Sequence, residues 1–269
     1  MVRPLTATVG IVGCGRMGGA IAAHLLAAGT PVAVYDPVAD ARRRLVERGA
    51  VECDGPAEVA RRSDVVLVVV VDDAQVREAV RAGLDGARGG TVVAISASVR
   101  PDTCRELARE GAERSVHVVD AALVRGERGA EEGRLVLFCG GAPEVVERLR
   151  AVAAPFAEAV VRVGDVGAGQ VAKTVNNILL WACIRADVEA LRLGRALGVE
   201  PAALREAMAV GSGANRPLAE WGKHRLRWPH KDLEVALALG RDASVPLPLV
   251  GALALLMEEL TVDDLHDLA

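Results

Sequence analysis

One lysine and one asparagine interrupt a long apolar segment at a spacing that suits catalysis. The segment begins at Gly167, runs without proline to about Leu197, and places Lys173 and Asn177 four residues apart. Side chains at that spacing share one face of a helix. A cation and an amide on an apolar helix cost desolvation free energy unless polar groups meet them. Because lysine can lose its proton near neutral pH, Lys173 is the candidate chemical centre. An ordinary salt bridge between domains is the alternative.

A glycine-rich turn near the start of the chain has the spacing of a dinucleotide-binding loop. It lies between a β-branched run at 7–12 and an Ala- and Leu-rich helical segment, and a second strand-like run at 32–35 follows. This βαβ context makes the G-x-G-x-x-G pattern specific. The three glycines serve the tight turn, the approach of the pyrophosphate and the close packing of helix on strand. The residues expected at the cofactor are Gly13, Cys14, Gly15, Arg16, Met17 and Gly18.

Asp36 ends the second strand, where a carboxylate can accept hydrogen bonds from ribose hydroxyls. A carboxylate would repel a 2′-phosphate, so the sequence favours NAD over NADP. The alternative is that Asp36 is a plain turn residue before Pro37.

Strand-like and helix-like segments alternate up to Gly164, and only helical patterns follow. This order predicts an α/β fold, with a doubly wound Rossmann domain at 1–164. A long interdomain helix would join it to an all-α domain at 165–269. We expect strands at 7–12, 32–35, 65–71, 91–95, 116–119, 135–139 and 160–163, and helices at 17–28, 39–48, 74–82, 102–110, 143–153, 166–197, 201–210, 218–225, 232–239 and 246–260. Residues 83–90 read as a loop and 120–134 as a turn-rich segment.

Composition narrows the classes of partner. The net charge of −4 shows no bias toward nucleic acid or anionic membranes, and no apolar run is long enough to cross a bilayer. The five cysteines are scattered and form no metal-binding pattern, which favours reduced thiols and a cytoplasmic protein. A long helix in a small domain leaves large apolar faces, so we expect a homodimer or homotetramer.

Four motifs, in order along nearly the whole chain, resemble those of the β-hydroxyacid dehydrogenases, the family of 3-hydroxyisobutyrate and tartronate-semialdehyde dehydrogenases. The cofactor loop is similar to G-x-G-x-M-G. The later stretches are similar to the substrate motif D-A-P-V-S-G-G-x-x-G-A, the catalytic motif G-x-G-x-x-x-K-x-x-N-N, and a terminal K-D-L. Here these stretches lie at Asp120–Ala130, Gly167–Asn177 and Lys231–Leu233.

The resemblance implies roles for residues in the last two motifs. Lys173 would lie beside the nicotinamide and take the hydroxyl proton as hydride leaves, or return it during carbonyl reduction. Asn177 would hold the substrate oxygens, with Asn176 supporting it from another face of the helix. Lys231 would close on the site near the nicotinamide; a plain charge at a helix start is the alternative.

The resemblance also implies contacts at the ends of two central strands. Ser98 is similar to the hydroxyl residue near the nicotinamide amide, which would touch both cofactor and substrate, and Ser96 is the competing assignment. Val70 and Val71 stand where the family often has Leu-Pro against the cofactor.

The substrate loop departs from the family pattern. Val124, Arg125 and Gly126 occupy the positions of the family's Ser-Gly-Gly, which binds a substrate carboxylate. Arginine adds a planar cation that suits carboxylate, sulfonate or phosphate, and the loop is similar to that of sulfolactaldehyde reductases. We expect Arg125 to anchor the acidic group of a small hydroxy acid or aldehyde. The alternative is that it turns outward to Glu127, Glu131 or Glu132.

The favoured function is an NAD-dependent oxidoreductase that interconverts a small 3-hydroxy acid and its semialdehyde or keto acid. A reductase of a sulfonated or phosphonated aldehyde and a non-catalytic dinucleotide-binding module are the alternatives. Imine reductases share the expected architecture but generally lack the lysine.

Overall fold

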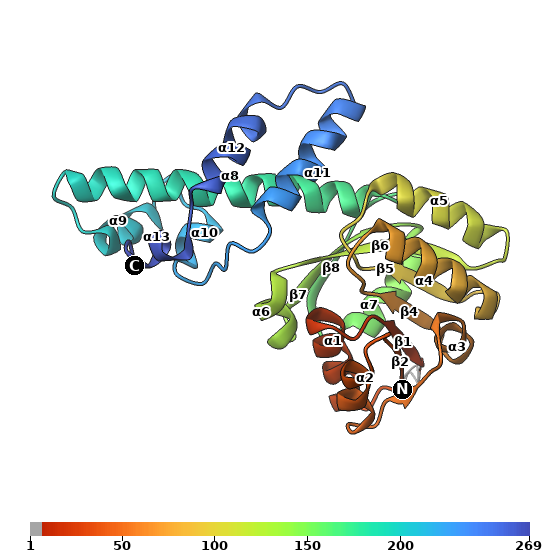
Figure 1. The fold of residues 1–269 in the computed structure, drawn as a ribbon. Coiled ribbons are helices and arrows are strands. Elements are labelled where there is room, and N and C mark those ends of the chain that lie inside the picture. The colour runs from red at the N-terminus through yellow and green to blue at the C-terminus, as the bar shows by residue number, and fades with distance from the viewer. Residues whose placement is uncertain (1–6) are drawn as a thin grey trace. The chain divides into compact units, whose positions relative to one another are not determined.

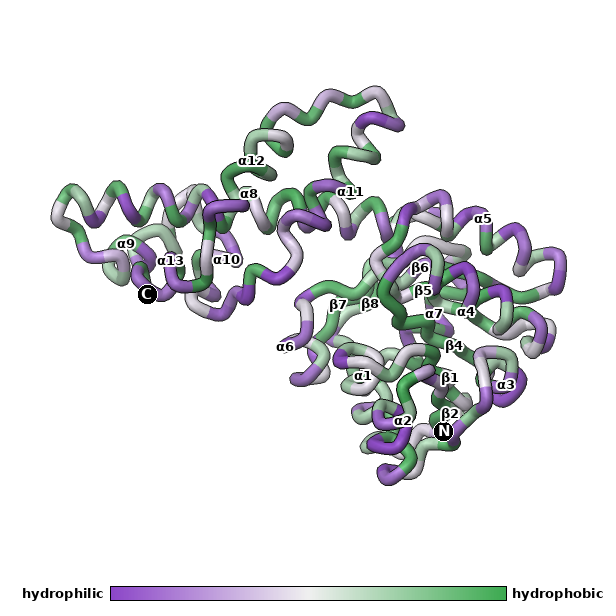
Figure 2. Tube along the Cα trace, viewed as in Figure 1, coloured by the Kyte–Doolittle hydropathy of each residue, from purple (hydrophilic) through white to green (hydrophobic). Residues whose placement is uncertain are grey.

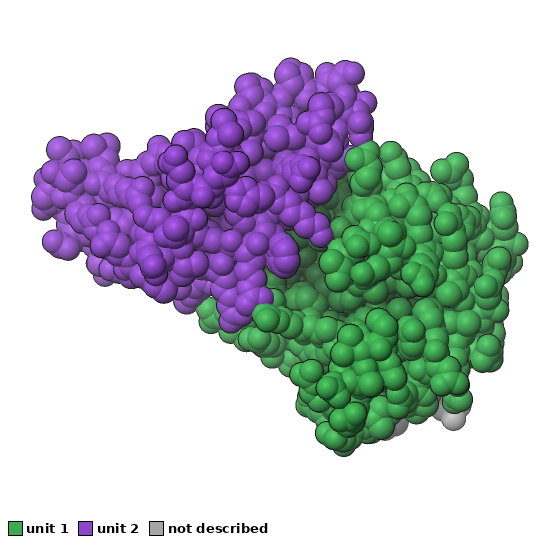
Figure 3. Space-filling view, in the orientation of Figure 1, with its two compact units in different colours: residues 1–173 green, residues 174–269 purple. Residues whose placement is uncertain are grey.

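The computed structural model describes residues 7–269, which form two compact units. The first unit extends to Lys173 and the second runs from Thr174 to Ala269 (Figure 3). A functional boundary after Gly164 stays a prediction.

Unit 1 is built on one eight-stranded sheet (Figure 1). The strand order is β3-β2-β1-β4-β5-β6-β7-β8, and all neighbours are parallel except the antiparallel pair β6 and β7. The strands are β1 (Val9–Val12), β2 (Val32–Tyr35), β3 (Val51–Glu52), β4 (Val65–Val68), β5 (Val92–Ile95), β6 (His117–Val124), β7 (Leu135–Gly140) and β8 (Ala157–Gly164).

Helices cover both faces of the sheet, as in a doubly wound fold. They are α1 (Arg16–Ala27), α2 (Ala39–Val46), α3 (Pro56–Arg62), α4 (Asp73–Gly86), α5 (Pro101–Ala112), α6 (Gly126–Glu131) and α7 (Pro143–Ala153). Successive side chains of a strand point to opposite faces. Thus Val9 and Ile11 of β1 pack in the cluster that contains α1, α2 and α7, whereas Val12 packs with α3, α4 and α5.

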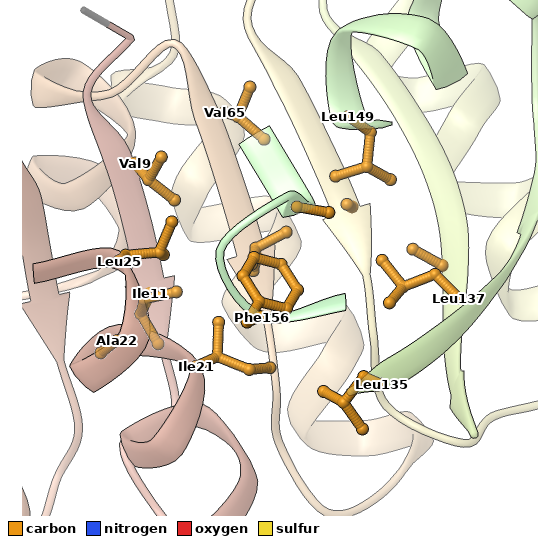
Figure 4. Close-up of a cluster of buried hydrophobic side chains, with 14 of the residues drawn as sticks. Val9, Ile11, Ile21, Ala22, Leu25, Val65, Leu135, Leu137, Leu149 and Phe156 are labelled. Carbon is orange, nitrogen blue, oxygen red and sulfur yellow. The ribbon is translucent and has the colours of Figure 1, made fainter. Parts of the chain in front are cut away.

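The central strands are apolar on both faces, as buried parallel strands are. All residues of β1, β4 and β5 are buried, and Figure 2 shows the hydrophobic character of these strands. In one of the two cores, the Phe156 ring lies between side chains of α1 and those of β7 and α7 (Figure 4). The core therefore fixes the strand ends from which the loops emerge.

Unit 2 is helical in all its described elements. It contains most of the 29-residue helix α8 (Ala168–Ala196), which begins in unit 1 and is about 44 Å long. The others are α9 (Pro201–Met208), α10 (Arg216–Ala219), α11 (Pro229–Asp242), α12 (Pro248–Glu258) and α13 (Val262–His266). Buried side chains from α8, α11 and α12 form its core. None of the helices among the described residues is both long and apolar enough to cross a membrane.

Several expectations about single segments are wrong. The segment 120–134 is not a run of turns, because β6 continues to Val124 and α6 follows. The strand expected at 65–71 ends at Val68, and the helix expected to end at 82 reaches Gly86. The helix expected at 218–225 ends at Ala219 with α10, and Gly222 beyond it adopts a positive φ angle that a helix does not. The short elements β3, α3 and α13 have no counterpart in the expected list.

Candidate active site

Several of the expected site residues meet at one edge of the sheet. Strands β1, β2, β4 and β5 are parallel neighbours, so their carboxyl ends lie together. Ligands of open α/β sheets bind outside these ends. The residues that follow these strands include Gly13, Asp36, Val70 and Ser98.

The glycine loop has the backbone shape that a dinucleotide requires. Gly13 has a φ of 98°, and a Cβ there would collide with the Val69 carbonyl. A Cβ on Gly15 would meet nothing within 4 Å, whereas one on Gly18 would collide with the Gly13 carbonyl. The loop thus leaves open space beside Gly15 at the start of α1, where backbone N–H groups favour phosphate. These features fit a bound dinucleotide.

Asp36 is buried and is bonded to the glycine loop. Its Oδ2 accepts a hydrogen bond from the Cys14 N–H at 2.7 Å, and its Oδ1 accepts one from the Val38 N–H at 2.8 Å. The second contact is the turn role that the sequence offered as the alternative. Each carboxylate oxygen can accept another bond, so the turn role does not prevent a ribose contact.

An arginine that the sequence analysis did not select lies beside Asp36. Arg42 of α2 donates from Nη1 to the Asp36 carbonyl and from Nε to Glu52 Oε1 at 2.6 Å. Arginine near this position can accept a 2′-phosphate. Here, however, Glu52 already provides it with a carboxylate. The cluster of arginines in α2 is the only sequence signal for this contact.

Three further loop residues differ in their surroundings. Burial raises the pKa of the Cys14 thiol to about 12, and its Sγ contacts the Tyr35 carbonyl at 3.5 Å. Met17 packs partly buried against the core. Arg16 is exposed and pairs with Glu127 of α6 at 3.3 Å, so the cofactor loop contacts the helix that follows the substrate loop.

The two serine candidates after β5 are distinguished by exposure. Ser96 is buried, and its hydroxyl has no hydrogen-bond partner among the described residues. Ser98 is exposed between two buried neighbours. After β4, Val70 is half-buried and Val71 is 66% exposed. Ser98 and Val71 are therefore the more accessible members of their pairs.

Strand β6 carries the substrate loop beyond the end of its parallel neighbour β5. Asp120 is level with Ile95, the last residue of β5, and four more residues of β6 pair only with β7. Four residues of strand extend about 13 Å. Val124, which ends β6, is half-buried, and Gly126, which begins α6, is exposed.

Arg125 adopts a left-handed conformation and pairs with an acid from outside its own loop. Its φ is 82°, which costs a non-glycine residue about 1–2 kcal/mol. The guanidinium contacts Glu158 of β8, and Arg134 contacts the same carboxylate at 3.2 Å. Arg125 Nε is buried without a hydrogen-bond partner in the described part of the chain. Arg125 therefore pairs with Glu158 and not with Glu127, Glu131 or Glu132, the three acids expected as alternatives.

Asp120 fixes the start of the helix that carries Lys173. The carboxylate is fully buried and accepts hydrogen bonds from the backbone N–H groups of Gly167, at 2.6 Å, and Gln170, at 3.0 Å. These are N–H groups that a helix start leaves without partners in the helix. Burial raises the Asp120 pKa, and the N–H donors oppose that rise.

Lys173 and Asn177 both lie on α8, one helical turn apart, but belong to different units. Lys173 is half-buried and belongs to unit 1, with the cofactor loop and Ser98. Asn177 is buried in unit 2, where its Oδ1 accepts a hydrogen bond from Asn176 Nδ2 at 3.2 Å. A supporting role for Asn176 stays a prediction.

The terminal K-D-L motif has one exposed and two anchored residues. Lys231 is exposed in the first turn of α11, and Leu233 lies in the core of unit 2. Asp232 accepts a hydrogen bond from Trp181 Nε1 at 3.0 Å. Trp181 is one turn beyond Asn177 on α8, so this motif packs near the Asn177 end of the helix.

No cluster of three or more metal-ligating side chains exists among residues 7–269. The groups assembled in unit 1 are a dinucleotide loop, an exposed hydroxyl, a lysine and an ion-paired arginine.

Two family models and several known proteins match this sequence over most of its length. The model for the NAD binding domain of 6-phosphogluconate dehydrogenase matches residues 8–164, and that for the NAD-binding region of NADP-dependent 3-hydroxyisobutyrate dehydrogenase matches residues 167–268. The chain is 34% identical to 3-hydroxyisobutyrate dehydrogenase of Pseudomonas aeruginosa, over 91% of this chain and 89% of that protein. It is 31% identical to 2-(hydroxymethyl)glutarate dehydrogenase of Eubacterium barkeri, over 90% and 85%.

A solved structure agrees with the fold. Mycobacterium tuberculosis 3-hydroxyisobutyrate dehydrogenase with L-serine superposes with a TM-score of 0.88 at 24% identity, covering 97% of this chain and 99% of that one. The motifs, the fold and the sequence matches together show that this chain belongs to the β-hydroxyacid dehydrogenase family of NAD(P)-dependent oxidoreductases.

Proposed function

We propose that this protein interconverts a small 3-hydroxy acid and its semialdehyde or keto acid, with NAD as the hydride carrier. The observation that carries the proposal is the position of Lys173 next to the segment that bears Ser98. It lies three residues after Gln170, whose side chain is hydrogen-bonded to the segment that presents Ser98 after β5. The lysine and the expected nicotinamide contact thus come from segments that touch each other.

The residues divide the work of the reaction between them. The loop from Gly13 to Gly18 would hold the pyrophosphate, and the bound nicotinamide would accept or supply the hydride. Lys173 would remove the proton from the substrate hydroxyl during oxidation and return it during reduction. The contact with Asn176 orients the Asn177 amide, whose NH₂ group would donate to a substrate oxygen. Lys231 would add a positive charge near the nicotinamide.

Initial rates of NAD reduction with a small panel test this function. Suitable compounds are 3-hydroxyisobutyrate, L-threonate and 2-(hydroxymethyl)glutarate, the compounds for which related dehydrogenases are named. Turnover of at least one compound supports the proposal. Tight NADH binding without turnover of any compound, in either direction, would favour a non-catalytic dinucleotide-binding protein.

We also propose NAD rather than NADP as the preferred cofactor. The buried Asp36 carboxylate would repel a 2′-phosphate on the ribose, and Arg42, the nearby cation that could accept such a phosphate, is already paired with Glu52. A ribose hydroxyl can donate to a carboxylate, whereas a phosphate cannot.

A reductase of sulfonated or phosphonated aldehydes is the second candidate, because Arg125 has an unsatisfied donor. The buried Nε has no hydrogen-bond partner among the described residues, and a tetrahedral anion offers several acceptors. Against this, Glu158 already neutralises the guanidinium. Reduction of a sulfonated aldehyde with a lower KM than that of its carboxylate analogue would favour the second candidate.

We infer a homodimer or homotetramer from the surface of unit 2. Val175, Leu179 and Leu193 of α8 are at least half exposed, and Leu249 and Leu255 of α12 are more than 60% exposed. Large exposed apolar side chains are covered most often by two-fold pairing of identical chains. Light scattering after size exclusion tests this, since a purely monomeric mass would contradict it.

A reducing compartment such as the cytoplasm suits the thiols of the chain. All five cysteines are free, and four are buried. Disulfides are rare in such compartments.

A further inference from the structure

The side chain of Gln170 is hydrogen-bonded to the backbone on both sides of Ser98. Its Oε1 accepts a hydrogen bond from the Val99 N–H at 3.2 Å, and its Nε2 donates to the Ala97 carbonyl at 2.7 Å. Gln170, Ala97 and Val99 are all at least 94% buried, whereas Ser98 between them is exposed. The two bonds therefore fix a peptide segment from which only the serine side chain projects.

Gln170 is itself held in place through its backbone. Its N–H donates to Asp120 Oδ2, while Asp120 Oδ1 accepts from the Gly167 N–H. A Cβ on Gly169 would collide with the Phe138 carbonyl and lie 2.7 Å from Asp120 Oδ2, so this turn packs directly on the sheet. The start of α8, strand β6 and the segment after β5 thus meet at one buried polar junction.

Lys173 follows this junction on the same helix. Three residues of an α-helix rise about 4.5 Å, and side chains three apart are neighbours on its surface. The junction therefore sets how far the exposed serine lies from the lysine. A buried amide costs desolvation free energy unless it is hydrogen-bonded. If the position only had to be filled, an apolar side chain of similar volume would serve without that cost.

We propose that Gln170 is a positioning residue for hydride transfer, which holds the Ser98 hydroxyl at a fixed place relative to Lys173. Ser98 then meets the nicotinamide amide while Lys173 meets the reacting hydroxyl. The inference rests on the proposed function, because it assigns these two residues to cofactor and substrate.

Two variants separate this role from simple packing. Gln170→Met keeps the approximate volume and removes both bonds, whereas Gln170→Glu keeps an acceptor for the Val99 N–H but loses the donor to the Ala97 carbonyl. Misplacement of reacting groups by about 1 Å can cost on the order of 100-fold in rate. We expect kcat to fall by about 10- to 100-fold in both variants while KM for the hydroxy acid changes less than threefold. Val171→Ala, at the exposed neighbouring position, is the control and should keep wild-type kcat.

A double-mutant cycle with Ser98→Ala is the decisive test, since residues that act through one another are not additive. Adding Gln170→Met to Ser98→Ala should lower kcat by less than threefold further. Multiplicative losses, or wild-type kcat in Gln170→Met, would overturn the proposal. If Gln170→Met does not fold, as judged by thermal unfolding, the same cycle is run with Gln170→Glu.

The affinity for NADH tests whether the two Gln170 hydrogen bonds position Ser98, separately from the reaction. We expect Ser98→Ala and the folded Gln170 variant each to weaken NADH binding by about three- to tenfold, the worth of one hydrogen bond. The double variant should be no weaker than the weaker single one. NADH binding can show this pattern even if the protein turns over no hydroxy acid. Absence of turnover would then contradict the proposed reaction but not the positioning role of Gln170. Additive losses of affinity would contradict the proposal that Gln170 positions Ser98.

Discussion

The guanidinium of Arg125 contacts the carboxylate of Glu158, although 33 residues separate them along the chain. Arg125 follows β6 and Glu158 lies in β8, with β7 between the two strands. The residue expected to anchor the acidic group of the substrate therefore already has a carboxylate partner. A substrate anion must share Arg125 with Glu158 or displace that contact.

Removing either partner should change substrate affinity in opposite directions. Arg125→Ala should lower kcat/KM for the acidic substrate by about 10- to 100-fold, the worth of a hydrogen bond to a charged group. Glu158→Gln should lower KM because the guanidinium loses a competing carboxylate. Steady-state kinetics measure both effects. Glu131→Gln removes the same charge from an exposed position of α6 and serves as the control. An unchanged kcat/KM in Arg125→Ala would remove its anchoring role.

Cofactor preference should depend on the two acids around Arg42. We expect at least tenfold higher kcat/KM with NAD than with NADP in the wild type. Glu52→Gln should raise kcat/KM with NADP by roughly tenfold, since Arg42 could then pair with a 2′-phosphate. Rates at matched cofactor concentrations provide the measurement, with Glu47→Gln, at an exposed position at the end of α2, as a control. Equal use of both cofactors by the wild type would mean that Asp36 does not face the ribose.

The buried thiols should make the protein unstable at high pH. Burial raises the pKa of Cys14 and of Cys139 from 9.0 to about 12 in the folded state. The unfolded chain then loses these protons at lower pH than the folded protein does. The contribution of the two thiols to the free energy of unfolding is therefore fully present below about pH 9 and decreases as the pH rises toward 12. Each such thiol contributes a slope of about 1.4 kcal/mol per pH unit in that window.

Urea unfolding between pH 8 and pH 11 measures this loss, and Cys14→Ser/Cys139→Ser should reduce its slope. A free energy of unfolding that stays constant between pH 9 and pH 11 in the wild type would contradict the expected behaviour.

Much of the fold follows from local patterns in the sequence. The short, continuous, β-branched runs of β1, β4 and β5, and the long proline-free apolar segment of α8, can be recognised without knowledge of their neighbours. Segment 120–134 resembles a run of turns in the sequence because the last residues of β6 depend on pairing with β7 and because α6 has only six residues. Such short elements are stabilised by tertiary packing rather than by their own propensity.

The site was predictable where motifs fix the local backbone. Gly13 and Gly18 have the close contacts that their spacing implies. In contrast, the contact between Arg125 and Glu158 depends on strand order, and that between Gln170 and the Ser98 segment joins positions 71 and 73 residues apart. No local pattern records such distances. Arg42 was missed for a related reason, because its role depends on Glu52 of a two-residue strand.

The most direct test of the central claim compares the wild type with Lys173→Ala. We predict NAD reduction by the wild type with at least one 3-hydroxy acid of the panel. The variant should lose about 100- to 10,000-fold in kcat, the usual contribution of a general acid or base, with an NADH Kd within twofold of the wild type. A Lys173→Ala enzyme that retained more than a tenth of the wild-type kcat would contradict the assignment of proton transfer to this lysine.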